Sequence, residues 1–280
     1  MFLITGANGQ LGRCLQDILP TQHCLLTDVN ELDITSEHAV LSFGQTHPVS
    51  AIINCAAYTN VDKAESEPEP ARQINAVGPA NLAKLAAQLQ IPMIHISTDY
   101  VFDGTANVPL SETASVRPLG VYGQTKYEGE QAVLNNAHTA VVLRTAWLYS
   151  PYGKNFVKTM LRLGAEKEKI GVVCDQIGTP TYAPHLAQAI VQILPQITPG
   201  TREVYHFTDE GVCSWYDLAC YTLRRANSTC RVEPILTKDY PTPAKRPAFS
   251  VLDKTKFKTT FNKVLWHWTQ GVEQCLQKLS

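Results

Sequence analysis

Tyr122 and Lys126 form a Tyr-x-x-x-Lys pair that occurs once in the chain, within "GVYGQTKYEGEQ". On a helix, side chains at positions i and i+4 share a face, so the phenol and the ammonium would lie side by side. A free phenol titrates near pH 10, and lowering its pKa toward 7 requires about 4 kcal/mol. One ammonium roughly 4 Å away supplies about that much at an effective dielectric near 20. We therefore predict that Tyr122 is the general acid for reducing a ketone and that Lys126 lowers its pKa.

Two further features would complete this site. The run "HISTDYVFDG" ends an apolar segment with Thr98, whose hydroxyl can hold the substrate oxygen. Lys126 can also reach the ribose of a nicotinamide cofactor, which would supply the hydride. The alternative is that Tyr122 is an ordinary packing residue on an amphipathic helix.

The glycine-rich stretch "TGANGQLG" follows an apolar run at the start of the chain. Glycine permits a tight turn after the strand and lets a pyrophosphate approach the first free N–H groups of the next helix. The last glycine allows that helix to pack closely on the strand. Asp28 ends the next apolar run, where a carboxylate can bind the adenosine ribose. The predicted dinucleotide contacts here are Gly6, Gly9, Gln10, Leu11, Gly12 and Asp28.

The elements that must position these groups alternate along the chain. Short apolar runs, "MFLIT", "HCLLTD", "SAIINCAA", "MIHIST" and "AVVLRT", predict strands buried on both faces. Helical patterns lie between them at 11–19, 37–45, 70–90 and 125–136. This order predicts an α/β fold with a doubly wound parallel sheet. Prolines and turn residues become denser later, so we expect a dinucleotide-binding domain at 1–147 and a smaller, loop-rich substrate domain at 148–280, partly interleaved with it.

Composition limits the other classes of function. The net charge of −1 and the lack of a basic cluster give no support to nucleic-acid binding. No apolar run approaches the roughly 18 residues of a membrane span, and no basic segment precedes the first apolar run, so we expect a cytoplasmic protein. The 8 cysteines lack C-x-x-C spacing and favour reduced thiols over a disulfide framework.

The G-x-x-G-x-x-G spacing and the Tyr–Lys pair resemble the extended short-chain dehydrogenase/reductase family, whose members share a Rossmann-type fold and mostly act on nucleotide sugars. Related 4,6-dehydratases typically read Thr-Asp-Glu where this chain reads Thr98-Asp99-Tyr100, so simple reduction fits better than dehydration. Within the family, "NCAAYTNVDKAESEPEPARQINA", "RTAWLYSPYGKNFVKTML" and "YPTPAKRPAFSVLD" resemble the dTDP-4-dehydrorhamnose reductases over nearly the whole chain.

This resemblance implies the NAD(P)H-dependent reduction of the 4-keto group of dTDP-6-deoxy-L-lyxo-4-hexulose to dTDP-L-rhamnose. It implies that Thr98, Tyr122 and Lys126 are catalytic. It implies that the cofactor is lined by Ala56, Ala57 and Tyr58. It implies that the sugar nucleotide meets Val61, Asp62, Thr98, Tyr100, Trp147, Asn155 and Arg246.

Some of these residues have their own chemical argument and their own alternative. An arginine in a proline-fixed loop, as at Arg246, suits a pyrophosphate, but Arg246 could instead be a solvated loop charge. Trp147 offers a flat face to a ring, but it could instead be core. For the whole chain, a reductase or epimerase of another nucleotide sugar, or a non-catalytic regulatory protein on the same fold, stays open.

Two departures from the family bear on metal and cofactor. Some members carry a glutamate, where this chain has Cys14, that helps to bridge a dimer through magnesium, and the stretch "TPTYAPHLAQ" also lacks acids. We therefore predict no metal site and a possible homodimer that is not metal-bridged. Asp28 would repel a 2′-phosphate, and no Lys or Arg occurs between Arg13 and Lys63 to offset it. We expect NADH to be preferred or both cofactors to be accepted.

Overall fold

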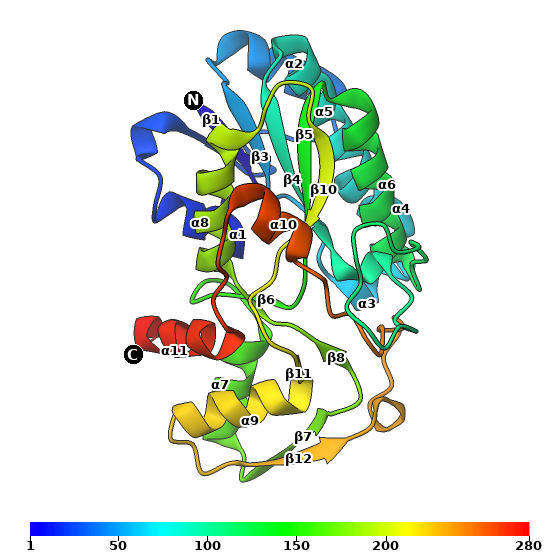
Figure 1. The fold of residues 1–280 in the computed structure, drawn as a ribbon, viewed down its shortest axis with the longest axis vertical. Coiled ribbons are helices and arrows are strands. Elements are labelled where there is room, and N and C mark those ends of the chain that lie inside the picture. Colours follow the sequence, from blue (N-terminus) through cyan, green and yellow to red (C-terminus); the bar gives the residue numbers. More distant parts are fainter. Residues whose placement is uncertain (280) are drawn as a thin grey trace.

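A parallel sheet of six strands forms the centre of the molecule in the computed structural model, which describes residues 1–279 (Figure 1). Ser280, the last residue of the predicted second domain, lies outside the described residues. The strand order is β10-β5-β4-β3-β1-β2. These strands are β1 (Phe2–Thr5), β2 (Cys24–Thr27), β3 (Ala51–Asn54), β4 (Pro92–Thr98), β5 (Thr139–Thr145) and β10 (Arg202–His206). The predicted α/β class with a doubly wound parallel sheet is confirmed.

Helices cover both faces of this sheet. The helices are α1 (Gln10–Gln16), α2 (Glu37–Thr46), α3 (Val61–Ala64), α4 (Pro68–Arg72), α5 (Gly78–Leu89), α6 (Val121–Asn136), α7 (Phe156–Glu166), α8 (Ala183–Ile193), α9 (Trp215–Arg225), α10 (Thr255–Phe261) and α11 (Trp268–Leu279). In Figure 1, α1 and α8 lie on one side of the sheet, and α2, α5 and α6 lie on the other.

Alternate strand residues therefore belong to two different hydrophobic cores, one on each face of the sheet. The core under α1, α8 and α10 includes Ile4, Ile53, Ile94, Val141 and Leu143. The core under α2, α5 and α6 includes Leu3, Ile52, Met93, Ala140 and Val142.

Two helices differ from the sequence prediction. The helix expected over 11–19 ends at Gln16. The helix expected over 70–90 is divided into α4 and α5 by a π-helical segment, Gln73–Val77. Pro79 has no N–H to donate to the carbonyl of Asn75, so the regular i→i−4 pattern cannot continue there. The polar side chain of Asn75 is fully buried at this irregularity.

The second half of the chain contributes to the central sheet and also forms a smaller layer beyond it. Strand β10 extends the sheet beside β5, and α8 packs on α1. The smaller layer, at the lower end of Figure 1, contains α7, α9 and short strand pairs. Its strands, with those that link it to the sheet, are β6 (Leu148–Tyr149), β7 (Lys169–Val173), β8 (Ile177–Gly178), β9 (Thr181–Tyr182), β11 (Cys213–Ser214) and β12 (Arg231–Ile235).

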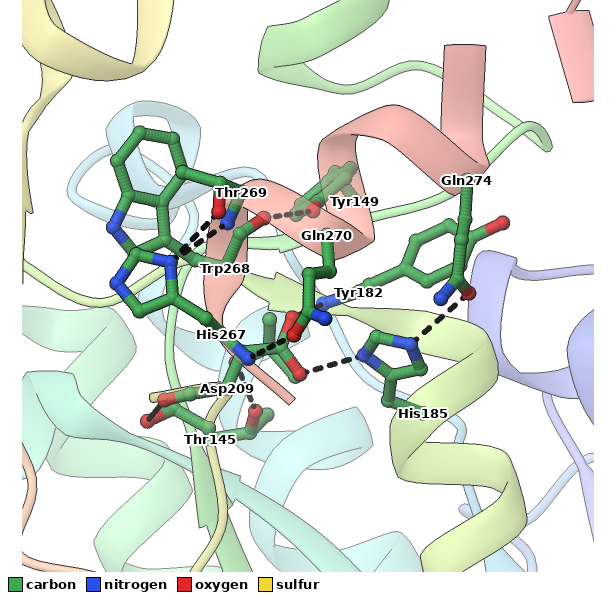
Figure 2. Close-up of polar contacts among 12 residues, drawn as sticks. Thr145, Tyr149, Tyr182, His185, Asp209, His267, Trp268, Thr269, Gln270 and Gln274 are labelled. Atoms are coloured by element: carbon green, nitrogen blue, oxygen red, sulfur yellow. Dashed lines mark hydrogen bonds and ion pairs between the residues drawn. The ribbon is translucent and has the colours of Figure 1, made fainter. Parts of the chain in front are cut away.

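A buried polar cluster fixes the C-terminal helix to this framework. Figure 2 shows the His185 ring, on α8, between Asp209 and Gln274. Its Nδ1 lies 2.8 Å from Asp209 Oδ1, and its Nε2 lies 3.1 Å from Gln274 Oε1. The other Asp209 oxygen accepts a hydrogen bond from the Tyr182 N–H at 3.1 Å. These contacts join α8, the segment after β10, and α11.

Candidate active site

The glycine-rich turn lies between β1 and α1 and packs directly on the segment after β3. Gly6 has φ +64°, a left-handed conformation that favours glycine, and a Cβ on it would lie 2.7 Å from the Ala56 nitrogen. A Cβ on Gly12 would collide with the Gly6 carbonyl. Gly9 is the N-cap residue of α1 and has no side chain to cap the first N–H groups, which include those of the next two residues, Gln10 and Leu11. The turn is therefore a close-packed backbone surface of the kind that a pyrophosphate can approach.

Asp28 lies beside this turn, at the carboxyl end of β2. Its Oδ2 accepts a hydrogen bond from the Asn8 N–H at 3.2 Å. A second carboxylate, Glu31, accepts from the Asp28 N–H at 2.9 Å. Two negative charges therefore lie next to the glycine-rich turn, where the sequence pointed to one.

Two asparagines hold the backbone at Ala56 and Tyr58, in the segment that follows β3. Asn54 Oδ1 accepts from the Ala56 N–H at 3.1 Å. Asn75 Oδ1 accepts from the Tyr58 N–H at 2.8 Å, and its amide nitrogen donates to Thr125 on α6 at 3.1 Å. Ala57 lies between the two fixed positions. Asn75 thus links the predicted cofactor-lining segment to the helix that carries Tyr122, a role that its place in the apolar run "QINAVGP" did not reveal.

Thr98 and Tyr122 come together at the carboxyl edge of the sheet. Thr98 ends β4 and is 5% exposed, and Tyr122 lies in the first turn of α6. The Thr98 side chain lies near enough to the Tyr122 phenol to lower the pKa of that phenol. The Tyr100 ring meets the Tyr122 ring edge to face, with centroids 5.4 Å apart. The sequence-predicted acid therefore has a hydroxyl group and an aromatic ring as neighbours.

The predicted lowering of the Tyr122 pKa by Lys126 is wrong for this geometry. Lys126 is 2% exposed, and its ammonium donates to the Ile96 carbonyl at 2.6 Å. Desolvation raises the pKa of Tyr122 to about 12, opposed by the nearby Thr98 side chain and reinforced by the charge of Asp99. Desolvation also lowers the pKa of Lys126 to about 8, opposed by the nearby Glu130. The cost of burying each charged form exceeds the attraction on which the prediction was based.

Apart from Thr98 and Tyr100, the predicted substrate residues form two groups. Asp62 and Arg246, 184 positions apart in sequence, form a bidentate pair with nitrogen–oxygen distances of 2.8 and 3.1 Å. Asp62 lies in α3, which packs on α6, and Val61 precedes it in the same helix. The pair lowers the pKa of Asp62, chiefly through the hydrogen bond from Arg246.

The second group, Trp147 and Asn155, follows β5 along the chain. The Asn155 amide donates to Gln10 Oε1 at 2.9 Å, so a predicted substrate residue contacts a predicted cofactor residue. Trp147 has φ +49°, a rare conformation for a side chain of this size. Its ring stacks on Trp215 with centroids 3.6 Å apart. One face of Trp147 is therefore covered by a residue that sequence reasoning did not select.

Two further residues, which the sequence pattern did not indicate, stabilise α6 or its packing. Glu65 accepts a hydrogen bond from the Val121 N–H at 2.8 Å and so caps the helix one residue before Tyr122. Glu130 lies in the same helix, fully buried and paired with Arg144. Glu65 stands in the charged run "VDKAESEPE", which gives no sign of a distant helix partner.

The described part of the chain gives two further results. Within residues 1–279, no group of three or more His, Cys, Asp or Glu side chains is arranged to hold a metal ion. None of the helices in that range is long and apolar enough to cross a membrane.

Comparison with known proteins covers the whole chain. A family model described as the RmlD substrate binding domain matches residues 1–280. The dTDP-4-dehydrorhamnose reductase of Aggregatibacter actinomycetemcomitans is 42% identical, covering 97% of this chain and 96% of that protein. The crystal structure of a dTDP-4-dehydrorhamnose reductase from Clostridium acetobutylicum superposes with a TM-score of 0.95 at 41% identity, covering 99% of both chains.

A second solved structure adds a ligand. The dTDP-4-dehydrorhamnose reductase of Bacillus anthracis, in complex with NADP, has a TM-score of 0.95 and 38% identity, with 99% of this chain and 98% of that chain covered. Sequence and fold thus agree from end to end with one group of enzymes. The chain belongs to the RmlD family of dTDP-4-dehydrorhamnose reductases.

Proposed function

We propose that this protein reduces the 4-keto group of dTDP-6-deoxy-L-lyxo-4-hexulose to dTDP-L-rhamnose with NAD(P)H. The observation that carries the proposal is the meeting of Thr98 and Tyr122 at the carboxyl edge of a parallel sheet, where ligands of such folds bind. Family membership supports the same reaction.

The residues present fit a dinucleotide. The turn at Gly6, Gly9 and Gly12 is a backbone cradle whose close contacts exclude side chains at Gly6 and Gly12. This turn would hold the pyrophosphate, and Asp28 would bind the adenosine ribose. The segment from Ala56 to Tyr58 would line the cofactor toward its nicotinamide end. When bound, the reduced nicotinamide supplies the hydride. Every other group in the reaction comes from the chain itself.

Tyr122 gives the proton to the oxygen that becomes the alcohol. Its pKa of about 12 keeps the phenol protonated at neutral pH, which is the form that an acid in a reduction needs. Thr98, next to it, orients the ketone oxygen. Lys126, whose ammonium donates to the Ile96 carbonyl, would bind the nicotinamide ribose from the inner side of the site.

The sugar nucleotide would lie between the sheet and the segments of the second half of the chain. In this proposal Arg246 binds the diphosphate of the substrate. Before the substrate binds, Asp62 holds the Arg246 guanidinium in place. Val61, Tyr100, Trp147 and Asn155 would contact the remainder of the substrate. The division into a cofactor part, 1–147, and a substrate part, 148–280, belongs to the same proposal.

The test is an absorbance assay of the purified protein with enzymatically prepared dTDP-6-deoxy-L-lyxo-4-hexulose and either NADH or NADPH. We expect cofactor oxidation with formation of dTDP-L-rhamnose, identified by chromatography. Matched 4-keto sugars on UDP and GDP distinguish a reductase of another nucleotide sugar. Cofactor binding without oxidation of any substrate would instead indicate a regulatory protein and refute the proposal.

Location and assembly are also proposed. Reduced nicotinamide nucleotides are kept in the cytoplasm, and we place the protein there. A homodimer without a bridging metal is expected, and its mass by light scattering should not change when EDTA is added.

A further inference from the structure

The first turn of α6, which carries Tyr122, is held from outside the helix. The first N–H groups of a helix have no partners within it. Gly120, the N-cap residue of α6, has no side chain that could cap them. The Glu65 carboxylate takes this role from 56 positions away in the sequence, accepting from the Val121 N–H at 2.8 Å. The helix dipole also favours a negative charge at this end.

Two glycines let the start of α6 approach its neighbours closely. A Cβ on Gly120 would collide with Glu65 Oε1. One residue beyond Tyr122, a Cβ on Gly123 would collide with the Tyr100 carbonyl oxygen. Tyr122 therefore lies between two close contacts, one to each side of it along the chain.

The support also reaches the proposed substrate site. Glu65 is the C-cap residue of α3, and Asp62 lies three residues earlier in that helix. Asp62 pairs with Arg246, and α3 packs on α6. The same short helix therefore carries the carboxylate that holds the proposed diphosphate-binding arginine and the carboxylate cap residue that fixes the start of α6.

We propose that Glu65 is a positioning residue that holds Tyr122 in place for proton donation to the ketone oxygen. The inference rests on the proposed function, in which Tyr122 is the acid. A phenol that donates its proton must lie within hydrogen-bond reach of the substrate oxygen, and a displacement of about 1 Å can lower a rate on the order of 10²-fold. Without Glu65 the Val121 N–H loses its partner, and Tyr122, the second residue of the helix, lies in the turn that frays first. Glu65 acts through the backbone of α6 and leaves the chemistry of the phenol unchanged.

Three variants separate this hydrogen bond from general stability. Glu65→Ala removes the acceptor, and Glu65→Gln keeps an oxygen at the same position. Ser36→Ala is the matched control, because the Ser36 side chain caps α2 by accepting from the Ala39 N–H. Rapid mixing with NADPH and the 4-keto sugar gives the rate of hydride transfer, fluorescence titration gives the Kd of NADPH, and calorimetry gives the Tm.

The expected pattern differs between the variants. Glu65→Ala should lower the rate of hydride transfer about tenfold or more, while the Kd of NADPH stays within about twofold of wild type. Glu65→Gln should recover most of the rate. Ser36→Ala should lower the Tm about as much as Glu65→Ala does, since each loses one helix cap, and should leave the rate unchanged.

Each other result overturns the inference. A rate for Glu65→Ala within about threefold of wild type would show that the cap does not position the acid. Failure of Glu65→Gln to recover the rate would assign the effect to charge, and an equal loss of rate in Ser36→Ala would assign it to stability. If wild type transfers no hydride to any 4-keto sugar, the proposed function itself fails, and the inference falls with it.

Amide hydrogen exchange of the wild-type protein is a second test that needs neither a variant nor activity. The Val121 N–H should exchange about tenfold or more slowly than the Gln10 N–H, which begins α1 after an N-cap residue without a side-chain cap. Equal exchange at the two positions would show that Glu65 does not hold the start of α6, and this result also overturns the inference.

Discussion

The buried ion pair between Glu130 of α6 and Arg144 of β5 predicts a large stability change from the replacement of one atom. Glu130 and Arg144 are 0% and 3% exposed and form two hydrogen bonds, at 2.7 and 2.8 Å. Ser97 donates a third hydrogen bond to Glu130 at 2.5 Å. His206, near the guanidinium, has its pKa lowered to about 3 by burial and by Arg144, so it is neutral and offers no charge compensation.

Glu130→Gln keeps the shape of the side chain and removes its charge. Leaving one member of a buried pair uncompensated costs about 3–5 kcal/mol. At roughly 2 °C per kcal/mol for a chain of this length, the Tm should fall by about 6–10 °C. The loss of the carboxylate also lowers the pKa of Lys126 further, because Glu130 is the larger of the two neighbours, with Cys55, that raise it. If the rate falls at high pH because Lys126 loses its proton, that fall should occur at lower pH in the variant.

Urea unfolding and differential scanning calorimetry measure the loss directly. The double variant Glu130→Leu/Arg144→Met removes both charges and should recover most of the stability, since the groups that lose a partner, the Ser97 hydroxyl and the His206 ring nitrogen, are both uncharged. The reasoning is refuted if Glu130→Gln lies within about 1 kcal/mol of wild type, or if the double variant is less stable than the single one.

Four further predictions concern the site. Tyr122→Phe should abolish turnover while the dissociation constant for NADPH, from fluorescence titration, stays nearly the same; retained turnover would exclude Tyr122 as the acid. Because Asp28 and the neighbouring Glu31 lie beside the glycine-rich turn, where we propose that the adenosine ribose binds, kcat/KM should favour NADH or be similar for both cofactors, and a more than tenfold advantage for NADPH would contradict this. Gly12→Ala should weaken binding of both cofactors or destabilise the fold, as isothermal titration and thermal melts can show, since a Cβ there meets the Gly6 carbonyl. Turnover should be unaffected by EDTA, and metal found in protein purified without added salts would count against the metal-free prediction made from Cys14.

The sequence by itself determined the features that depend on local patterns. Continuous apolar runs identified five of the strands because a parallel strand buried on both faces needs no polar alternation. The glycine spacing identified the turn at Gly6, where the backbone requires a positive φ. The i, i+4 spacing placed Tyr122 and Lys126 on one helix, which the structure contains as α6.

Tertiary structure decided which partner each of these groups has. Lys126 could have pointed to the phenol, but the fold places the Ile96 carbonyl within its reach, and desolvation then sets both pKa values. The Asp62–Arg246 pair joins residues 184 positions apart, and β10 comes from beyond residue 200 to complete the sheet. No local pattern encodes such contacts, because burial and long-range pairing exist only when the whole chain has packed.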